Sequence, residues 1–136
     1  GLGWVQDPHG HGAGRKLLGA VALVGVIQGV SAVGLHQSGA FDAGLVHLQG
    51  LKSLQRLFLA KTAISDAGLA HIRPLTNLEV LNVYGTRMTS VGLSHMKGLK
   101  NLRMLYITDL KLKVSAVDEL KRTLPKLKVT QYTEVP

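Results

Sequence analysis

One pattern of residues occurs three times in succession, as DAGLVHLQGLKSLQRLFLAKTAIS at 42–65, DAGLAHIRPLTNLEVLNVYGTRMT at 66–89 and SVGLSHMKGLKNLRMLYITDLKLK at 90–113. Matching residues are 24 positions apart, as in Gly44, Gly68 and Gly92 or in Leu57, Leu81 and Leu105. A fixed period of about 20 to 50 residues is typical of repeat architectures, in which each unit stacks on its neighbours. The sequence therefore predicts a stack of at least three similar units.

Each unit combines a strand pattern with a helix pattern. In the second unit, Leu81 and Val83 are separated by one residue, so both side chains point to one face of a short strand. Leu69 and Ile72 lie three residues apart, on one face of a helix that Asp66 or Ser65 can cap. One unit cannot bury its apolar side alone, so neighbouring units must share a core. We expect Leu57, Leu81 and Leu105 to form one buried column.

Two motifs carry a family resemblance. The pattern L-x-x-L-x-L-x-x-T at 54–62, and at 78–86 with Val83 as its third apolar residue, resembles the consensus of the leucine-rich repeat family. The junction T-x-I-S-D-A-G-L at 62–69 is similar to a bacterial subgroup of 24-residue repeats, the DAGL subgroup, often attached to exported or membrane-bound proteins. The resemblance covers about residues 42–127. It implies an α/β solenoid shaped as a short horseshoe, with parallel strands on the concave face and helices on the convex face.

The resemblance also assigns roles to single residues. It implies that the polar residue after each strand, here Thr62 or Thr86, joins neighbouring turns through hydrogen bonds. Leu110 occupies the same position in the third unit, so the last loop is expected to be built differently. The recurring histidines His47, His71 and His95 would form a column on the convex side, where the subgroup places histidine against the adjoining turn.

The rest of the chain is divided on composition and phase. The 136 residues fit one domain, and an apolar content of 46% can fill a core. Residues 1–16 have no periodic pattern and are expected to be a flexible tail. Residues 114–136 are expected to be a C-terminal capping repeat, with a helix that Ser115 caps, a last strand near LPKLKVTQY and a loose TEVP end.

Residues 17–41 permit two interpretations. The run LLGAVALVGVIQGVSAVGL at 17–35 is apolar and long enough to span a membrane, or to serve as a secretory signal. Alternatively, it is a degenerate first repeat, because Val33 and Leu35 precede Leu57 and Leu59 by 24 residues. The second interpretation predicts a helix followed by a strand within residues 18–41, in register with the next unit.

Composition and motifs argue against enzyme activity and against a metal site. The chain has no cysteine, so it has neither a disulfide framework nor a thiolate metal site. Asp42 and Asp66 are interpreted as helix caps, Glu79 stands alone among strand residues, and no serine lies in a G-x-S-x-G motif. We therefore expect no enzyme activity, no catalytic residues, no cofactor, no bound metal and no small-molecule substrate.

The net charge of +8 comes from basic residues scattered among the repeats. A basic surface that is simply exposed to solvent explains this charge. The more specific alternative is a surface that binds an anionic partner. Binding of nucleic acid or anionic lipid ranks last, because aromatic residues that could stack on bases are sparse. The composition leaves the cellular compartment undecided, although the resemblance favours the cell envelope or an exported protein.

The function that the resemblance implies is a protein-binding scaffold. Residues between the core leucines of each strand should point out from the concave face. Adjacent strands lie about 4.8 Å apart, so Phe58, Asn82 and Tyr106 should be direct neighbours. Exposed aromatics and arginine are favoured at protein interfaces, although aromatics can also simply cover a sheet. The predicted partner-binding residues are Arg56, Phe58, Asn82, Tyr84, Met104 and Tyr106. The alternative from another class is a membrane-anchored structural subunit, with residues 17–35 in the bilayer.

Overall fold

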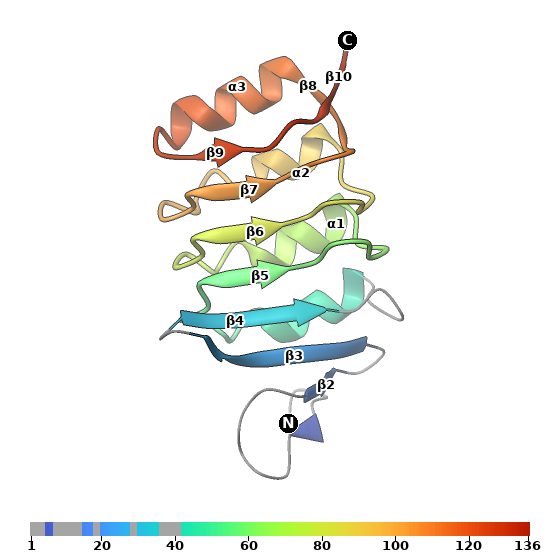
Figure 1. Cartoon of the computed structure of the whole chain (residues 1–136), viewed down its shortest axis with the longest axis vertical. Helices are drawn as coiled ribbons and strands as arrows, with labels where there is room; N and C mark the ends of the chain where they lie inside the picture. Colours follow the sequence, from blue (N-terminus) through green and yellow to red (C-terminus); the bar gives the residue numbers. More distant parts are fainter. Residues whose placement is uncertain (1–4, 7–14, 18–19, 28–29, 36–41) are drawn as a thin grey trace.

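The computed structural model describes residues 5–6, 15–17, 20–27, 30–35 and 42–136. In this part of the chain, eight strands form one sheet in the order β1-β2-β3-β4-β5-β6-β7-β9, and β8 pairs with β10 in a second sheet. The helical segments lie on one side of the large sheet (Figure 1). The chain is therefore a two-layered α/β structure in which sequence order follows spatial order.

The parallel part of the sheet has the 24-residue register that the sequence predicts. Residue Val33 pairs with Leu57, Leu57 with Leu81, Leu81 with Leu105, and Leu105 with Val129. All these pairings are parallel, and the strands have two or three residues each except the first, which has six. The strands are β4 (Val30–Leu35), β5 (Arg56–Phe58), β6 (Val80–Asn82), β7 (Met104–Tyr106) and β9 (Lys128–Val129).

Helical segments connect these strands and neighbour one another along the stack. They are the 3-10 helix η1 (Asp42–Leu48), α1 (Asp66–Leu69) with the 3-10 helix η2 (Ala70–Ile72), α2 (Ser90–Ser94) and α3 (Val114–Thr123). Contacts run from η1 to α1, from α1 to α2 and from α2 to α3. Each crossover from one parallel strand to the next therefore places its helix on the same face.

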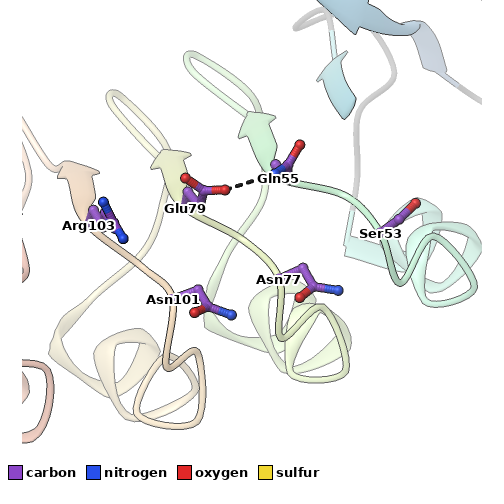
Figure 2. A pocket seen from close by; sticks show the side chains of 6 residues that line it. All are labelled: Ser53, Gln55, Asn77, Glu79, Asn101 and Arg103. Atoms are coloured by element: carbon purple, nitrogen blue, oxygen red, sulfur yellow. Dashed lines mark hydrogen bonds between the residues drawn. The ribbon is translucent and has the colours of Figure 1, made fainter. Parts of the chain in front are cut away.

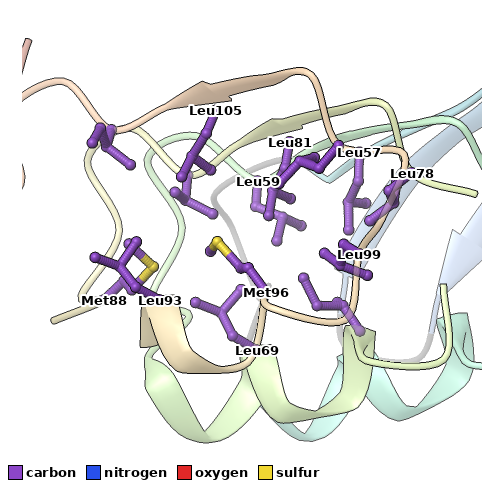
Figure 3. Packing of buried hydrophobic residues seen from close by; sticks show 14 of the residues in the cluster. Leu57, Leu59, Leu69, Leu78, Leu81, Met88, Leu93, Met96, Leu99 and Leu105 are labelled. Carbon is purple, nitrogen blue, oxygen red and sulfur yellow. The ribbon is translucent and has the colours of Figure 1, made fainter. Parts of the chain in front are cut away.

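The core lies between the strands and the helices (Figure 3). Leu57, Leu81 and Leu105 have no exposed surface, which confirms the predicted buried column. Leu69 and Met96 meet them from the helical side and are equally buried. Because every unit contributes matching side chains to one continuous cluster, no unit has a core of its own.

The expectation for residues 18–41 is half confirmed. Strand β4 pairs with β5 in the predicted register, with Ala32 opposite Arg56 and Gly34 opposite Phe58. The predicted helix before it is wrong, because β3 (Ala20–Ile27) is a strand that pairs antiparallel with β4. Its many valines favour a strand over a helix.

Strands also occupy the stretch where the membrane-anchored alternative requires one continuous helix. Within the described ranges, no helix has both the length and the apolar character needed to cross a bilayer. In the expected tail at 1–16, β1 (Val5–Gln6) and the start of β2 (Arg15–Leu17) form an antiparallel pair. The remainder of that tail lies outside the described residues.

Each repeated aspartate bonds to the last residue of its own 24-residue unit, at the N-cap of the following helix, contrary to the expectation that the aspartates cap helices. Asp66 Oδ1 accepts a hydrogen bond from the backbone N of Thr89 at 2.8 Å, and Asp66 Oδ2 accepts one from Thr89 Oγ1 at 2.5 Å. Asp42 accepts the same two bonds from Ser65, at 2.6 Å and 2.5 Å. Ser65 is at the N-cap of α1 and makes no capping hydrogen bond with its side chain. The N-cap residue of the following helix thus provides both donors.

These aspartates explain why the motif contains glycine. A Cβ atom on Gly68 would lie 2.3 Å from Asp42 Oδ1 and 3.0 Å from the Asp42 Cα. A Cβ atom on Gly92 would lie 2.6 Å from Asp66 Oδ1. The aspartate and the glycine of the Asp-Ala-Gly sequence therefore meet across neighbouring units. The aspartate of one unit occupies the space that a side chain on the next unit's glycine would need.

The loops after the strands also differ from what the resemblance implies. Thr62 Oγ1 donates to the carbonyl of Leu59, and Thr86 Oγ1 donates to the carbonyl of Val83, both at 2.8 Å. These bonds stay within one repeat, so the role of joining turns is wrong for both threonines. Backbone groups join the loops, as in the 2.7 Å bond from Lys61 N to the Tyr84 carbonyl.

The C-terminal unit is built differently, as predicted from Leu110. The loop continues into β8 (Lys111–Lys113), which pairs in parallel with β10 (Thr133–Val135). The expected loose end at TEVP is thus wrong, because β10 lies within it. Helix α3 has Lys113 at its N-cap without a side-chain hydrogen bond, so the expected cap at Ser115 is also wrong.

Candidate functional site

The predicted concave row exists as a set of cross-strand neighbours. Phe58 pairs with Asn82, and Asn82 pairs with Tyr106. The central residue of each strand is buried, whereas Phe58 and Asn82 are partly exposed and Tyr106 is 37% exposed. This alternation follows from the period of two in a strand, because the leucines occupy the face toward the helices. The sheet therefore presents one amide and two aromatic rings side by side on its outer face.

A second outward row runs parallel to the first. Arg56 pairs with Val80, and Val80 pairs with Met104, all three being partly exposed. The row continues to the exposed Lys128 of β9. Predicted site residues Arg56 and Met104 thus share a row but are separated by one strand, so they are not direct neighbours.

The last predicted site residue, Tyr84, lies just beyond the end of β6. Its backbone N donates to Asn82 Oδ1 at 3.0 Å, which ties it to the first row. The ammonium of Lys61 lies 5.7 Å from the centre of the Tyr84 ring, within the range of a cation–π contact. The structure therefore brings Phe58, Asn82 and Tyr106 together directly, and places Tyr84 at their edge.

The exposed surface also has a polar hollow of ≈ 490 Å³ at the N-terminal ends of the strands, which we name the strand-start hollow (Figure 2). Gln55 and Glu79 lie one repeat apart, and Gln55 Nε2 donates to Glu79 Oε2 at 2.9 Å. The hollow is lined by Ser53, Gln55, Asn77, Glu79, Asn101 and Arg103. Sequence reasoning treated Glu79 as isolated. The 24-residue spacing of Gln55, Glu79 and Arg103 could have shown that Glu79 stacks between the other two.

The described histidines on the helical side, His71 and His95, bond to the preceding repeat, as the resemblance implies. Gln49 Nε2 lies 3.2 Å from His71 Nδ1, and Arg73 Nε donates to His95 Nδ1 at 2.9 Å. The side chain of His47 lies outside the described residues. In the part of the chain that the structure describes, no three histidine, cysteine, aspartate or glutamate side chains gather where they could hold a metal ion.

His95 should make stability depend on pH. Partial burial, and then the Arg73 guanidinium, lower its pKa below the ordinary 6.5, while Asp66 acts in the opposite direction. The unfolded chain therefore binds a proton at this residue at higher pH than the folded chain does, so stability should fall as pH falls below 6.5. We expect His95→Asn, which keeps an acceptor but does not titrate, to show a smaller drop in Tm between about pH 7.5 and 5.5. An unchanged drop would contradict this assignment.

In-register parallel strands, helices on one face and shared leucine columns define a repeat protein of the α/β class. No protein-family model matches the chain, and comparison with curated proteins finds no match. Among solved structures, the fold is similar to internalin C2 from Listeria monocytogenes str. 4b F2365, a leucine-rich repeat protein, with a TM-score of 0.53 and 26% identity. The similarity covers 66% of this chain and 39% of that chain. It supports a leucine-rich repeat fold.

Proposed function

We propose that this chain is a leucine-rich repeat solenoid of the 24-residue DAGL subgroup and acts as a non-catalytic protein-binding scaffold. In this proposal, the outward face of the parallel strands is the concave binding face. A protein-interaction role fits the likeness to a leucine-rich repeat protein, whose chain is longer than this one.

One observation carries the proposal: Phe58, Asn82 and Tyr106 form a row on the face of the sheet opposite the described helical segments. The buried leucines of the same strands already fill the core, so the two rings have no packing role there. Aromatic rings supply large contact areas with few rotatable bonds and are frequent at the centres of interfaces. Arg56, Tyr84 and Met104 extend this face.

The test replaces Phe58, Tyr84 and Tyr106 with serine and measures capture of a partner from the source organism. We expect capture to be lost while the circular dichroism spectrum and Tm stay close to those of the parent chain. Binding would weaken because two or three interface aromatics each contribute about 1 kcal/mol or more.

Val91→Ser is the matched control, because Val91 is 62% exposed and belongs to helix α2 on the other face. It removes a similar exposed apolar side chain and should leave capture unchanged. Capture that survives the triple substitution and fails in Val91→Ser would place the interface on the helices. Loss of folding in the triple variant would mean that the aromatics cover the sheet and hold it together.

A further inference from the structure

We propose that the strand-start hollow, together with a basic hollow beside it, binds an extended acidic segment of a protein. This site lies at the beginnings of the strands and involves none of the aromatic residues of the proposed concave face. The inference therefore goes beyond the proposed function and can stand or fail independently of it.

The two hollows adjoin along residues 100–103. Asn101 and Arg103 line the strand-start hollow, whereas Lys100 and Leu102 line the second one. The second hollow has a volume of ≈ 280 Å³ and is lined by Lys100, Leu102, Thr123, Leu124, Pro125 and Lys126. We name it the basic hollow. Residues 100–103 therefore contribute side chains to both hollows, which makes the two hollows neighbours along this segment.

Charge is unevenly distributed between the two hollows. Arg103, Lys100 and Lys126 are all exposed, and Lys128 lies beside them through the 2.8 Å bond from its backbone N to the Arg103 carbonyl. Among the described lining residues, Glu79 alone is acidic, and it accepts the hydrogen bond from Gln55. A bound segment would therefore place its carboxylates at the end near Arg103 and the lysines, away from Glu79.

The other end of the site is suited to a polypeptide main chain. Asn77 Nδ2 donates to the Lys52 carbonyl at 2.8 Å, and Asn101 Nδ2 donates to the Thr76 carbonyl at 3.1 Å. These bonds fix the two amides one repeat apart, and each amide keeps a carbonyl oxygen that can accept a main-chain N–H. Figure 2 shows Ser53, Asn77 and Asn101 in one row and Gln55, Glu79 and Arg103 in another. Polar groups thus recur at the spacing of the repeats.

A peptide fits these features better than a nucleic acid does. No aromatic ring is among the described residues that line either hollow, so these residues offer bases nothing to stack on. Evenly spaced phosphates would also bring negative charge against Glu79, whereas a peptide can carry carboxylates only where the basic residues lie. Strands are about 4.8 Å apart, so a segment crossing from Ser53 to Lys126 spans about 15 Å, or roughly five extended residues.

Fluorescence anisotropy with two labelled heptapeptides tests this proposal: one has three glutamates followed by four glycines, and the other has three lysines followed by four glycines. The folded full chain should bind the glutamate peptide at low salt, more weakly as salt rises, and should bind the lysine peptide at least about tenfold more weakly. Arg103→Glu with Lys126→Glu should weaken binding of the glutamate peptide by about tenfold or more.

Two further variants separate local recognition from net charge. Arg87→Glu changes an exposed arginine in the loop after β6, outside both hollows, and should have little effect. Glu79→Gln keeps an acceptor for Gln55 and removes the repulsive charge, so it should strengthen binding of the glutamate peptide. Tyr106→Ser should leave that binding unchanged, which keeps this test separate from the concave-face test.

Equal losses in Arg87→Glu and Arg103→Glu would overturn the proposal, because attraction would then depend on overall charge alone. Weaker binding in Glu79→Gln would also overturn it. Tighter binding of a single-stranded oligonucleotide than of the glutamate peptide would assign the basic surface to nucleic acid.

Discussion

Replacing Leu81 with alanine is expected to lower the free energy of unfolding by about 2–5 kcal/mol. Leu81 has no exposed surface and lies between Leu57 and Leu105 in the core column, so truncation leaves a cavity that neighbours on both sides border. Stability in a stack of repeats is shared between adjacent units, and this array is short. The loss should therefore be seen as unfolding of the whole array in urea, followed by circular dichroism.

Val91→Ala is the control for this prediction. The Val91 side chain is 62% exposed, so its truncation should change the free energy of unfolding by less than about 0.5 kcal/mol. Equal midpoints for Leu81→Ala and the parent chain would mean that Leu81 is not in a shared core column.

Gly68→Ala is expected to destabilise the chain by about 1–3 kcal/mol, although it adds only one methyl group. The new Cβ would lie 2.3 Å from Asp42 Oδ1 and 3.0 Å from the Asp42 backbone Cα. The Asp42 carboxylate can move away only by losing the hydrogen bonds that Ser65 donates to it. The Asp42 Cα belongs to the main chain and cannot move without shifting the backbone. The Tm of the purified variant measures the effect.

Gly98→Ala provides the comparison, because a Cβ atom there would meet nothing within 4 Å. It should leave Tm unchanged or slightly raised, since alanine restricts the unfolded chain. Adding Asp42→Ala to Gly68→Ala should cost less than the sum of the two single changes, because the clash with the carboxylate is then gone. Additive losses, or equal behaviour of the two glycine variants, would show that Asp42 does not press on Gly68.

The parallel register could be predicted from the sequence because it depends on a repeated length. Once Leu57, Leu81 and Leu105 recur every 24 residues, only one alignment of the strands buries all three. The same argument correctly placed Val33 under Leu57 in β4. It failed for β3, because an apolar run matches core positions in a helix or a strand, and pairing with β4 decides between them.

The partners of the repeated aspartates could not be predicted from the sequence. An aspartate at a helix start is typically a cap, and nothing in the local sequence shows that Ser65 or Thr89, 23 residues later, bonds to it. The loop positions with positive φ angles could not be predicted from residue type either. Lys61, Gly85 and Asp109 occupy one left-handed loop position with φ of 58°, 67° and 66°, yet only one of them is glycine.

The candidate site was predicted in part. Alternation within strands is sufficient to place Phe58, Asn82 and Tyr106 in one outward row, which the register then brings together. The strand-start hollow was missed because its residues lie before the strands, where no alternation rule applies. Its stacking becomes visible only when Gln55, Glu79 and Arg103 are compared at the same position of successive units.

The most direct test of the proposed concave interface is site-specific photo-crosslinking to a captured partner. A benzophenone side chain at position 106 would replace Tyr106, which is 37% exposed on the outward strand face, and the same group at position 91 would replace Val91 on helix α2. We predict a crosslinked partner from position 106 and none from position 91. Crosslinking from position 91 alone would contradict the account and move the interface to the helical face.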